Sequence, residues 1–326
     1  MQRAYSTSVE SACGVTPEPD SLSNPLDEIA RRELGVNYLF PYQKLVVSNI
    51  LEGRDQIVIL PTGAGKSLCF QFPAKLLPGA TIIVFPLISL ITDQRRRLEE
   101  QGIRCETLKG GQSSQERREI WAGIRRMETK ILLTTPEALL AARAIKELRS
   151  LCISHLVVDE AHCVSEWGDS FRPTYLQLGQ VPKEAGIPLL TAFTATASPR
   201  VLARVREVLF GNEAVNLVRA NPDRPNISYT VLPSLSKEHT LTELIREVER
   251  PAIVFCRTRA STEHTSRMLR ERLHDRRIRF YHAGLSKPER RHIEEWFFNS
   301  PDGVLTATCA YGMGVASYMI VYYIDI

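Results

Sequence analysis

Residues 56–77 decide the fold of this chain and read QIVILPTGAGKSLCFQFPAKLL. The apolar run Gln56–Leu60 enters the glycine-containing turn Pro61–Ser67, and a segment with helical spacing, Leu68–Leu77, follows the turn. In a strand, turn and helix of this kind, the backbone N–H groups of the turn converge at a helix N-terminus and can bind phosphate oxygens. The stretch therefore predicts a phosphate-binding loop in an α/β domain. A chance glycine-rich turn is the alternative, and the flanking strand and helix disfavour it.

The chemistry of this turn predicts ATP and Mg²⁺ as its ligands. Lys66 is expected to reach the β- and γ-phosphates, and the Ser67 hydroxyl is expected to ligate Mg²⁺. The other loop residues expected to bind the nucleotide are Thr62, Gly63, Ala64 and Gly65. The full P-loop pattern has glycine at position 60, where this chain has Leu60, so the turn matches a shorter Thr-Gly-x-Gly-Lys-Ser form.

Short apolar runs alternate with helical segments along the chain. The strands predicted for a first domain are Gln56–Leu60, Thr81–Phe85, Ile131–Thr134, Leu156–Val158 and Leu189–Phe193. Those predicted for a second domain are Ala252–Cys256, Ile278–Tyr281, Gly303–Ala307 and Ile320–Ile324. Continuous apolar strands separated by helices indicate parallel sheets covered on both faces. The pattern predicts a flexible tail over residues 1–24 and two tandem α/β domains, over 25–218 and 219–326.

Composition limits the class of protein. Hydrophobic residues make up 44% of the 326 residues and charged residues 24%, which is ordinary for a globular protein. No apolar run approaches the roughly 20 residues of a membrane span, so no membrane partner is expected. Seven cysteines without a Cys-x-x-Cys pair indicate reduced thiols inside a cell. The net charge of +4 permits a polyanionic partner without requiring one.

A pair of acidic residues follows the strand Leu156–Val158. Asp159 is expected to hold Mg²⁺ through water, and Glu160 to orient and deprotonate an attacking water. His162 is expected to relay between two sites, since zinc binding by His162 and Cys163 lacks further ligands at a suitable spacing. A solvated acidic strand end is the alternative. The phosphate-binding loop upstream makes that alternative improbable.

From Leu34 to Ala310 the chain resembles the RecQ family of superfamily 2 DNA helicases, motif by motif and in order. The segment from Leu34 to Gln43 is similar to the adenine-reading motif of the family, which implies that Gln43 recognises the base. Phe85–Leu90 and Thr134–Glu137 resemble the motifs that touch the DNA backbone, here through Ser89 and Thr135. Thr194–Ala197 resembles the motif that couples hydrolysis to DNA contact, with Thr194 and Thr196 in that role.

The segment Cys163–Tyr175 resembles the aromatic-rich loop of the RecQ family. By this resemblance Trp167 and Phe171 stack on unpaired bases, and Arg172 senses phosphate or the nucleotide state. Asp223–Asn226 matches a hallmark of the family at its domain junction. Three segments resemble motifs IV, IVa and V of the second domain: Phe255–Arg259, Tyr281–Gly284 and Thr306–Gly314. From these, Arg257 is expected to contact DNA, and Gly312 and Gly314 to take part in coupling.

The resemblance implies two RecA-like domains and an ATP-dependent DNA helicase motor that moves 3′ to 5′ on single-stranded DNA and unwinds duplexes in DNA repair and recombination. Its partners would be single-stranded and partly duplex DNA, in the cytoplasm (nucleoid) of a bacterium or the nucleus of a eukaryote. Two other functions remain open. One is a nucleotide-binding, DNA-binding remnant with little hydrolysis. The other is an RNA helicase, which Asp223–Asn226 and the aromatic-rich loop disfavour.

Three departures from the family pattern bear on activity. Phe40 stands where the family usually has arginine, three residues before Gln43. Val315–Met319 lacks the charged residues that usually follow Gly314. The chain ends at Ile326, before the motif that carries the arginine finger, a group that contributes about 10³–10⁵ in rate. The sequence thus predicts a second domain that is incomplete at its C-terminus and exposes a sheet edge.

Overall fold

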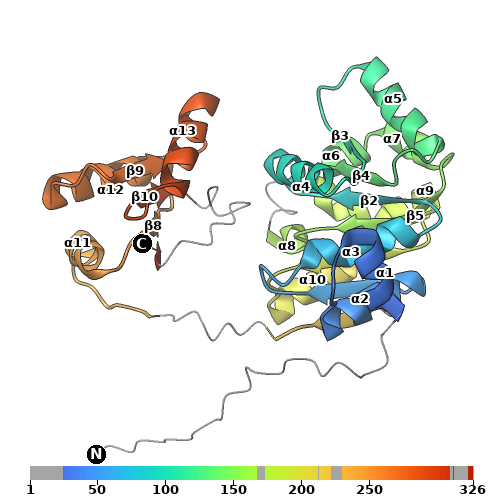
Figure 1. Cartoon of the computed structure of the whole chain (residues 1–326), viewed down its shortest axis with the longest axis horizontal. Helices are drawn as coiled ribbons and strands as arrows, with labels where there is room; N and C mark the ends of the chain where they lie inside the picture. Colours follow the sequence, from blue (N-terminus) through green and yellow to red (C-terminus); the bar gives the residue numbers. More distant parts are fainter. Residues whose placement is uncertain are drawn as a thin grey trace, which may run out of the picture. The chain divides into compact units, whose positions relative to one another are not determined.

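The computed structural model describes residues 25–166, 173–211, 213–221, 230–308, 311 and 322–325. Within these ranges the chain forms two compact units (Figure 1). The first unit consists of the residues up to 84 together with residues 101–221, and the second of residues 85–100 and 222–326. Each unit contains one parallel sheet.

A seven-stranded parallel sheet forms the first unit, in the order β3-β4-β2-β5-β6-β1-β7. Its strands are β1 (Gln56–Ile59), β2 (Ala80–Val84), β3 (Cys105–Leu108), β4 (Ile131–Thr134), β5 (Ile153–Val158), β6 (Leu190–Thr194) and β7 (Asn216–Arg219). Every residue of β1, β2, β4, β5 and β6 is buried, as continuous apolar strands require. The order of the strands brings the C-terminal ends of β5, β6 and β1 side by side.

Helices cover both faces of this sheet (Figure 1). They are α1 (Pro25–Leu34), α2 (Pro41–Leu51), α3 (Lys66–Leu76), α5 (Ser114–Arg125), α6 (Pro136–Leu139), α7 (Ala142–Leu148), α8 (Cys163–Glu166), the 3₁₀ helix η1 (Pro173–Gln180), α9 (Val181–Ala185) and α10 (Pro199–Phe210). Side-chain caps begin several of them. Ser113 accepts the Glu116 N–H at the start of α5, and Ser198 accepts the Val201 N–H at the start of α10.

The strands predicted for the first unit are all present, with ends shifted by up to three residues. Two further strands, β3 and β7, escaped prediction. β3 carries Glu106 between Cys105 and Thr107, and β7 is an exposed strand at the edge of the sheet with one buried residue, Val218. Neither forms an apolar run, and both lie at the edges of the sheet, where a strand need not be continuously apolar.

The second unit holds a four-stranded parallel sheet in the order β11-β8-β10-β9. Its strands are β8 (Ala252–Phe255), β9 (Ile278–Tyr281), β10 (Val304–Ala307) and β11 (Tyr322–Asp325), and its helices are α4 (Ile88–Glu100), α11 (Lys237–Glu247), α12 (Arg259–Leu273) and α13 (Lys287–Phe298). All four predicted strands are present. In the described part of the chain, no helix has the length and apolar character needed to cross a membrane.

Alternate residues of β8 pack into two different clusters, one on each face of the sheet. Ala252 and Val254 lie in the cluster that includes Leu241 of α11 and Leu269 of α12. Ile253 lies in the cluster that includes Phe297 of α13. The period-two alternation of a strand thus produces the helix–sheet–helix layering expected for an apolar parallel strand.

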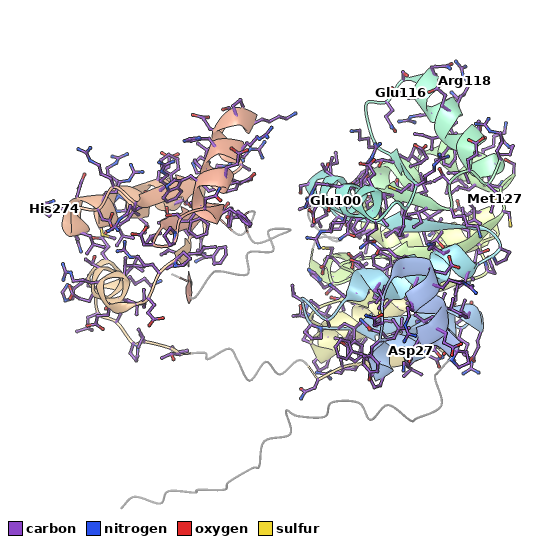
Figure 2. All side chains as sticks on the ribbon, viewed as in Figure 1. Asp27, Glu100, Glu116, Arg118, Met127 and His274 are labelled. Carbon is purple, nitrogen blue, oxygen red and sulfur yellow. The ribbon has the colours of Figure 1, made fainter. Side chains whose placement is uncertain are left out.

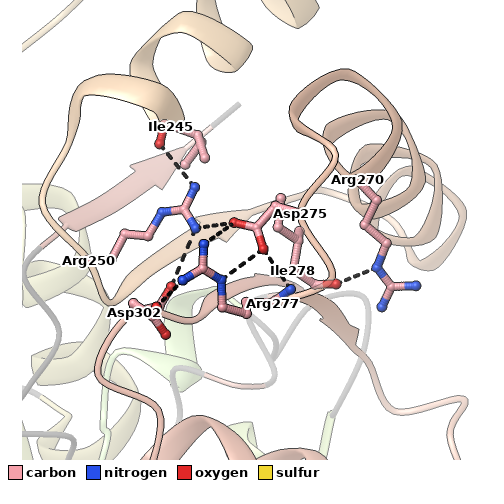
Figure 3. Close-up of polar contacts among 7 residues, drawn as sticks. All are labelled: Ile245, Arg250, Arg270, Asp275, Arg277, Ile278 and Asp302. Carbon is pink, nitrogen blue, oxygen red and sulfur yellow. Dashed lines mark hydrogen bonds and ion pairs between the residues drawn. The ribbon is translucent and has the colours of Figure 1, made fainter.

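A network of ion pairs joins the starts of three strands in the second unit (Figure 3). Arg250 precedes β8, Asp275 and Arg277 precede β9, and Asp302 precedes β10. The Asp275 carboxylate accepts hydrogen bonds from Arg250 Nη1 at 2.5 Å and from Arg277 Nε at 2.9 Å, and Arg277 also pairs with Asp302. Although burial acts to raise the pKa of Asp275, the hydrogen bonds from Arg277 and Arg250 hold that pKa well below its ordinary value. The network ties together the edge opposite the C-terminal ends of the strands.

Asp275→Asn is expected to destabilise the second unit by about 2–3 kcal/mol, because it leaves the nearly buried Arg250 without its anion. Since the pKa of Asp275 is depressed in the folded state, its contribution is fully present above the ordinary carboxyl pKa and is lost only at lower pH. Amide hydrogen exchange of β8 and β9 at neutral pH measures the loss. Glu243→Gln breaks an exposed pair with Arg246 and should cost about 0.5 kcal/mol or less. Equal protection in both variants would contradict the prediction.

Candidate active site

The predicted phosphate-binding loop joins the C-terminal end of β1 to the start of α3. Gly63 and Gly65 have φ values of 84° and 73°, and Gly65 is the N-cap residue of α3. A Cβ at Gly65 would lie 2.5 Å from Nε2 of Gln43. Glycine is therefore favoured there for its left-handed backbone, and a larger residue would also displace the end of the Gln43 side chain. The turn closes on itself through the Ala64 N–H, which donates to the Pro61 carbonyl at 3.1 Å.

Lys66 of this loop meets Glu160, which follows β5. The Lys66 ammonium lies 3.1 Å from Oε1 of Glu160, and the two side chains are 13% and 28% exposed. They approach each other because β5, β6 and β1 are neighbours in the sheet, and parallel strands end at the same edge. Two predicted residues from distant parts of the sequence are thus brought into one ion pair.

Asp159 lies beside this pair and is almost fully buried. Its backbone N–H donates to the Val84 carbonyl at 2.9 Å, while its Oδ1 has no hydrogen-bond partner among the described residues. Burial raises the pKa of Asp159 to about 6, with Lys66 opposing the rise and Glu160 adding to it. An unpartnered, buried carboxylate oxygen is the group that a hydrated cation would satisfy, so Asp159 fits the predicted Mg²⁺.

No group of three or more His, Cys, Asp or Glu side chains able to hold a metal occurs in the described ranges. Mg²⁺ is commonly held by one or two protein groups, by water and by substrate phosphates, in place of an all-protein cage. Asp159 and the Ser67 hydroxyl are therefore the residues of this chain that would hold it together with a nucleotide.

Asp159→Asn is expected to stabilise the metal-free protein. Because the carboxyl pKa rises from 3.8 to about 6 on folding, the ionised carboxylate destabilises the fold above pH 6 by about 1–3 kcal/mol. Below the ordinary pKa the group is protonated in both states and the penalty disappears. Thermal unfolding in EDTA should show the variant's midpoint above that of the parent at pH 8, with the two converging towards pH 4. An equal or lower midpoint at pH 8 would contradict this prediction.

Glu160 adopts a left-handed backbone, with φ of 49°. For a residue with a side chain this conformation is uncommon and strained, and such strain gathers at functional sites. The turn is fixed by the Cys163 N–H, which donates to the Glu160 carbonyl at 3.0 Å. The strained backbone lets the Glu160 side chain face both Lys66 and His162.

His162, Thr194 and Thr196, predicted to couple two sites, form a continuous chain from Glu160. His162 Nδ1 lies 3.4 Å from Oε2 of Glu160 and 3.1 Å from Oγ1 of Thr194. The Thr194 hydroxyl donates its one proton to the Thr196 carbonyl at 2.9 Å. We therefore assign the proton in the His162–Thr194 contact to Nδ1, since the hydroxyl can only accept there.

Gln43, predicted to recognise the base, is buried and contacts the phosphate-binding loop. Its Oε1 accepts the Phe40 N–H at 2.9 Å, and its Nε2 donates to the Ala64 carbonyl at 3.2 Å. The hydroxyl of Tyr42 donates to the same carbonyl at 3.2 Å. Sequence reasoning missed Tyr42, because its partner is a backbone atom and no residue pattern marks such a contact.

The residues predicted to contact DNA lie on several different elements. Thr135 is buried, and its hydroxyl accepts the Ala138 N–H as the cap of α6. Ser89 is exposed in α4 of the second unit, and Arg257 is exposed after β8. Five further predicted residues lie outside the described ranges, namely Trp167, Phe171, Arg172, Gly312 and Gly314. The roles assigned to all of these residues stay predictions.

Two family models match this chain. The DEAD/DEAH box helicase model matches residues 40–205, more than half of the chain, and the helicase conserved C-terminal domain model matches residues 236–324. Among solved structures, helicase Lhr of Mycobacterium smegmatis bound to single-stranded DNA and AMP-PNP superposes with a TM-score of 0.65 at 23% identity, covering 91% of this chain and 43% of that one. At this identity the likeness shows the shared fold alone.

Curated relatives are more similar in sequence. A probable ATP-dependent DNA helicase RecS of Bacillus subtilis is 38% identical over 84% of this chain and 55% of its own length. A DNA helicase RecQ of Synechocystis is 33% identical over 89% of this chain and 62% of its own length. The chain thus spans little more than half the length of these relatives. The family model shows that the chain belongs to the DEAD/DEAH box helicases, and these curated relatives are RecS and RecQ helicases.

Proposed function

We propose that this chain is the ATP-hydrolysing motor of a DNA helicase, which moves 3′ to 5′ along single-stranded DNA and separates duplexes. The observation that carries the proposal is the meeting of Lys66 and Glu160 at 3.1 Å beside the unpartnered Oδ1 of Asp159. A cation, a carboxylate able to accept a proton and a buried carboxylate open to Mg²⁺ are the groups that phosphoryl transfer to water requires.

Each group has a distinct task in this mechanism. Lys66 leaves Glu160 for the β- and γ-phosphates, whose greater negative charge attracts its ammonium more strongly. Glu160, freed from Lys66, orients the attacking water and accepts its proton. Asp159 and Ser67 would hold Mg²⁺, which when bound would neutralise charge on the phosphate oxygens. Hydrolysis thus depends on an exchange of partners by Lys66.

The chain from Glu160 through His162 to Thr194 offers a route by which hydrolysis reaches the rest of the first unit. A change in the charge or position of Glu160 alters the contact of its Oε2 with His162 at 3.4 Å, and His162 in turn holds Thr194. In this proposal Thr194 and Thr196 transmit the nucleotide state to residues that hold the DNA backbone.

DNA is the proposed partner because the more similar relatives are named DNA helicases, including RecS and RecQ. The structural neighbours are less similar in sequence, and they were solved with different nucleic acids. Lhr is bound to single-stranded DNA, and the helicase Mss116, at 17% identity and a TM-score of 0.65 over 92% of this chain and 66% of that one, is bound to single-stranded RNA. The fold therefore does not choose between the two nucleic acids, and the relatives favour DNA.

Steady-state ATP hydrolysis by the purified chain tests the proposal, in the presence of single-stranded DNA, of single-stranded RNA of the same sequence, and of neither. We expect DNA to raise the rate at least tenfold and RNA to raise it less. Displacement of a strand from duplexes with either a 3′ or a 5′ single-stranded tail then tests direction, and only the 3′-tailed duplex should open. A rate that is the same in all three conditions would overturn the proposal of a DNA-driven motor.

A further inference from the structure

Three aromatic side chains alternate along the segment that precedes and begins α2. The rings of Tyr38 and Phe40 meet edge to face, with centroids 5.7 Å apart, and the rings of Phe40 and Tyr42 stack in parallel at 5.5 Å. The far end of this row is fixed as well. The ammonium of Lys44 lies 4.9 Å from the centre of the Tyr38 ring and pairs with Asp27 at 2.6 Å. Asp27 lies on α1 of the first unit (Figure 2).

The row ends on the phosphate-binding loop. The Tyr42 hydroxyl donates to the Ala64 carbonyl at 3.2 Å, and Nε2 of Gln43 donates to the same oxygen at 3.2 Å. Burial raises the pKa of Tyr42, so its phenol keeps the proton that it donates. The loop is therefore held from outside by two donors that converge on one backbone oxygen.

The two donors differ in what else they do. Gln43 also accepts the Phe40 N–H, and in the proposed function its carboxamide recognises the base. A carboxamide that turns to a base cannot keep both of its present contacts, whereas the Tyr42 hydroxyl has no such second task. Tyr42 is thus the donor that can hold Ala64 throughout the nucleotide cycle.

Phe40 packs against the ring of Tyr42. Its ring stacks on that of Tyr42 at an interplanar angle of 7°, and its backbone is fixed by Gln43 and by the start of α2. Phe40 is also the residue that departs from the family pattern, which has arginine at this position. In place of the arginine, this chain has an aromatic ring that stacks on the ring of Tyr42.

We propose that Tyr42 is a positioning residue that holds the phosphate-binding loop through the Ala64 carbonyl, and that Phe40 acts through Tyr42. This inference rests on the proposed nucleotide site but concerns the shape of the loop before any nucleotide binds. Loss of one neutral hydrogen bond corresponds to roughly a three- to tenfold change in an equilibrium. We expect this loss of affinity for ligands whose phosphates bind in the loop.

The test compares Tyr42→Phe with Tyr38→Phe, a matched loss of one phenol hydroxyl from the same row. Calorimetric titration with ADP and with AMP, both with Mg²⁺, separates the phosphates from the base. We expect Tyr42→Phe to weaken ADP binding about three- to tenfold and AMP binding by less than twofold, and Tyr38→Phe to leave both unchanged. Equal weakening of ADP and AMP, or equal effects of the two variants, would overturn the inference.

Amide hydrogen exchange of residues 61–68 in the nucleotide-free protein provides a readout that does not depend on nucleotide binding. Tyr42→Phe should speed exchange there about three- to tenfold, with exchange in β4 and β5 unchanged. Unchanged exchange in the loop would refute the role of Tyr42. If the parent protein bound no ADP while the loop still loosened in the variant, the proposed function would fail and the positioning role of Tyr42 would stand.

Phe40→Leu tests the second part of the inference. It removes the aromatic stack and keeps an apolar side chain, so ADP affinity should fall in the same direction as in Tyr42→Phe and by a smaller factor. If Phe40 acts through Tyr42, the double variant should be no weaker than Tyr42→Phe alone. Effects that multiply in the double variant would show that Phe40 acts independently of Tyr42.

Discussion

Glu160→Gln is expected to lower ATP hydrolysis by about 10²–10⁴-fold while ATP still binds. Glutamine has the shape of glutamate but cannot accept a proton from water at neutral pH. The change also removes the anion that Lys66 pairs with at 3.1 Å. In the free protein the Lys66 ammonium would then lack its competitor for the phosphates, so ATP should bind at least as tightly as it does to the parent.

The separation of these two effects makes the experiment decisive. Single-turnover hydrolysis measures the chemical step, and titration with ATP in Mg²⁺ measures binding. Glu147→Gln serves as the matched control, because Glu147 forms a partly exposed pair with Arg125 outside the site, and both measurements should stay as in the parent. Turnover by Glu160→Gln within tenfold of the parent would show that another group accepts the proton.

Much of the candidate site could be proposed from sequence patterns because each of its parts has a local signature. A strand, glycine turn and helix mark Lys66, and an apolar run that ends in two acids marks Asp159 and Glu160. The structure brings Lys66 and Glu160 together although they are 94 positions apart. That meeting could be anticipated only in outline, because it depends on β5, β6 and β1 being neighbours, and long-range pairing sets the order of strands.

The features that the sequence could not predict are mostly backbone conformations and contacts to backbone atoms. The left-handed Glu160, the shared carbonyl of Ala64 and the unpartnered Oδ1 of Asp159 arise from how segments meet, and no residue type announces them. The missed strands β3 and β7 have a similar cause. Both lie at the edges of the sheet, where a strand need not be continuously apolar, so their patterns match those of loops.

Lys66→Ala is expected to weaken ATP binding by about 10²-fold and to reduce hydrolysis below detection, since its ammonium pairs with Glu160 in the free protein and is the group expected to bind the phosphates. The variant also changes the protein without ligand. Lys66 lowers the pKa of Asp159, whereas burial and Glu160 raise it, so its removal should raise that pKa further. Asp159 would then hold its proton at higher pH and compete less well for Mg²⁺.

Lys66→Ala therefore combines a loss of phosphate binding with a raised pKa of Asp159. Lys66→Arg separates these two effects. Arginine restores the positive charge beside Glu160 and Asp159, but its planar group does not reproduce the compact ammonium within the loop. We expect Lys66→Arg to recover most of the parent's thermal stability and its pH dependence in EDTA, while hydrolysis stays at least about 10²-fold below that of the parent. Full recovery of hydrolysis would mean that Lys66 acts only by balancing the two carboxylates. In that case the exchange of partners between Glu160 and the phosphates would not be the step that starts the cycle.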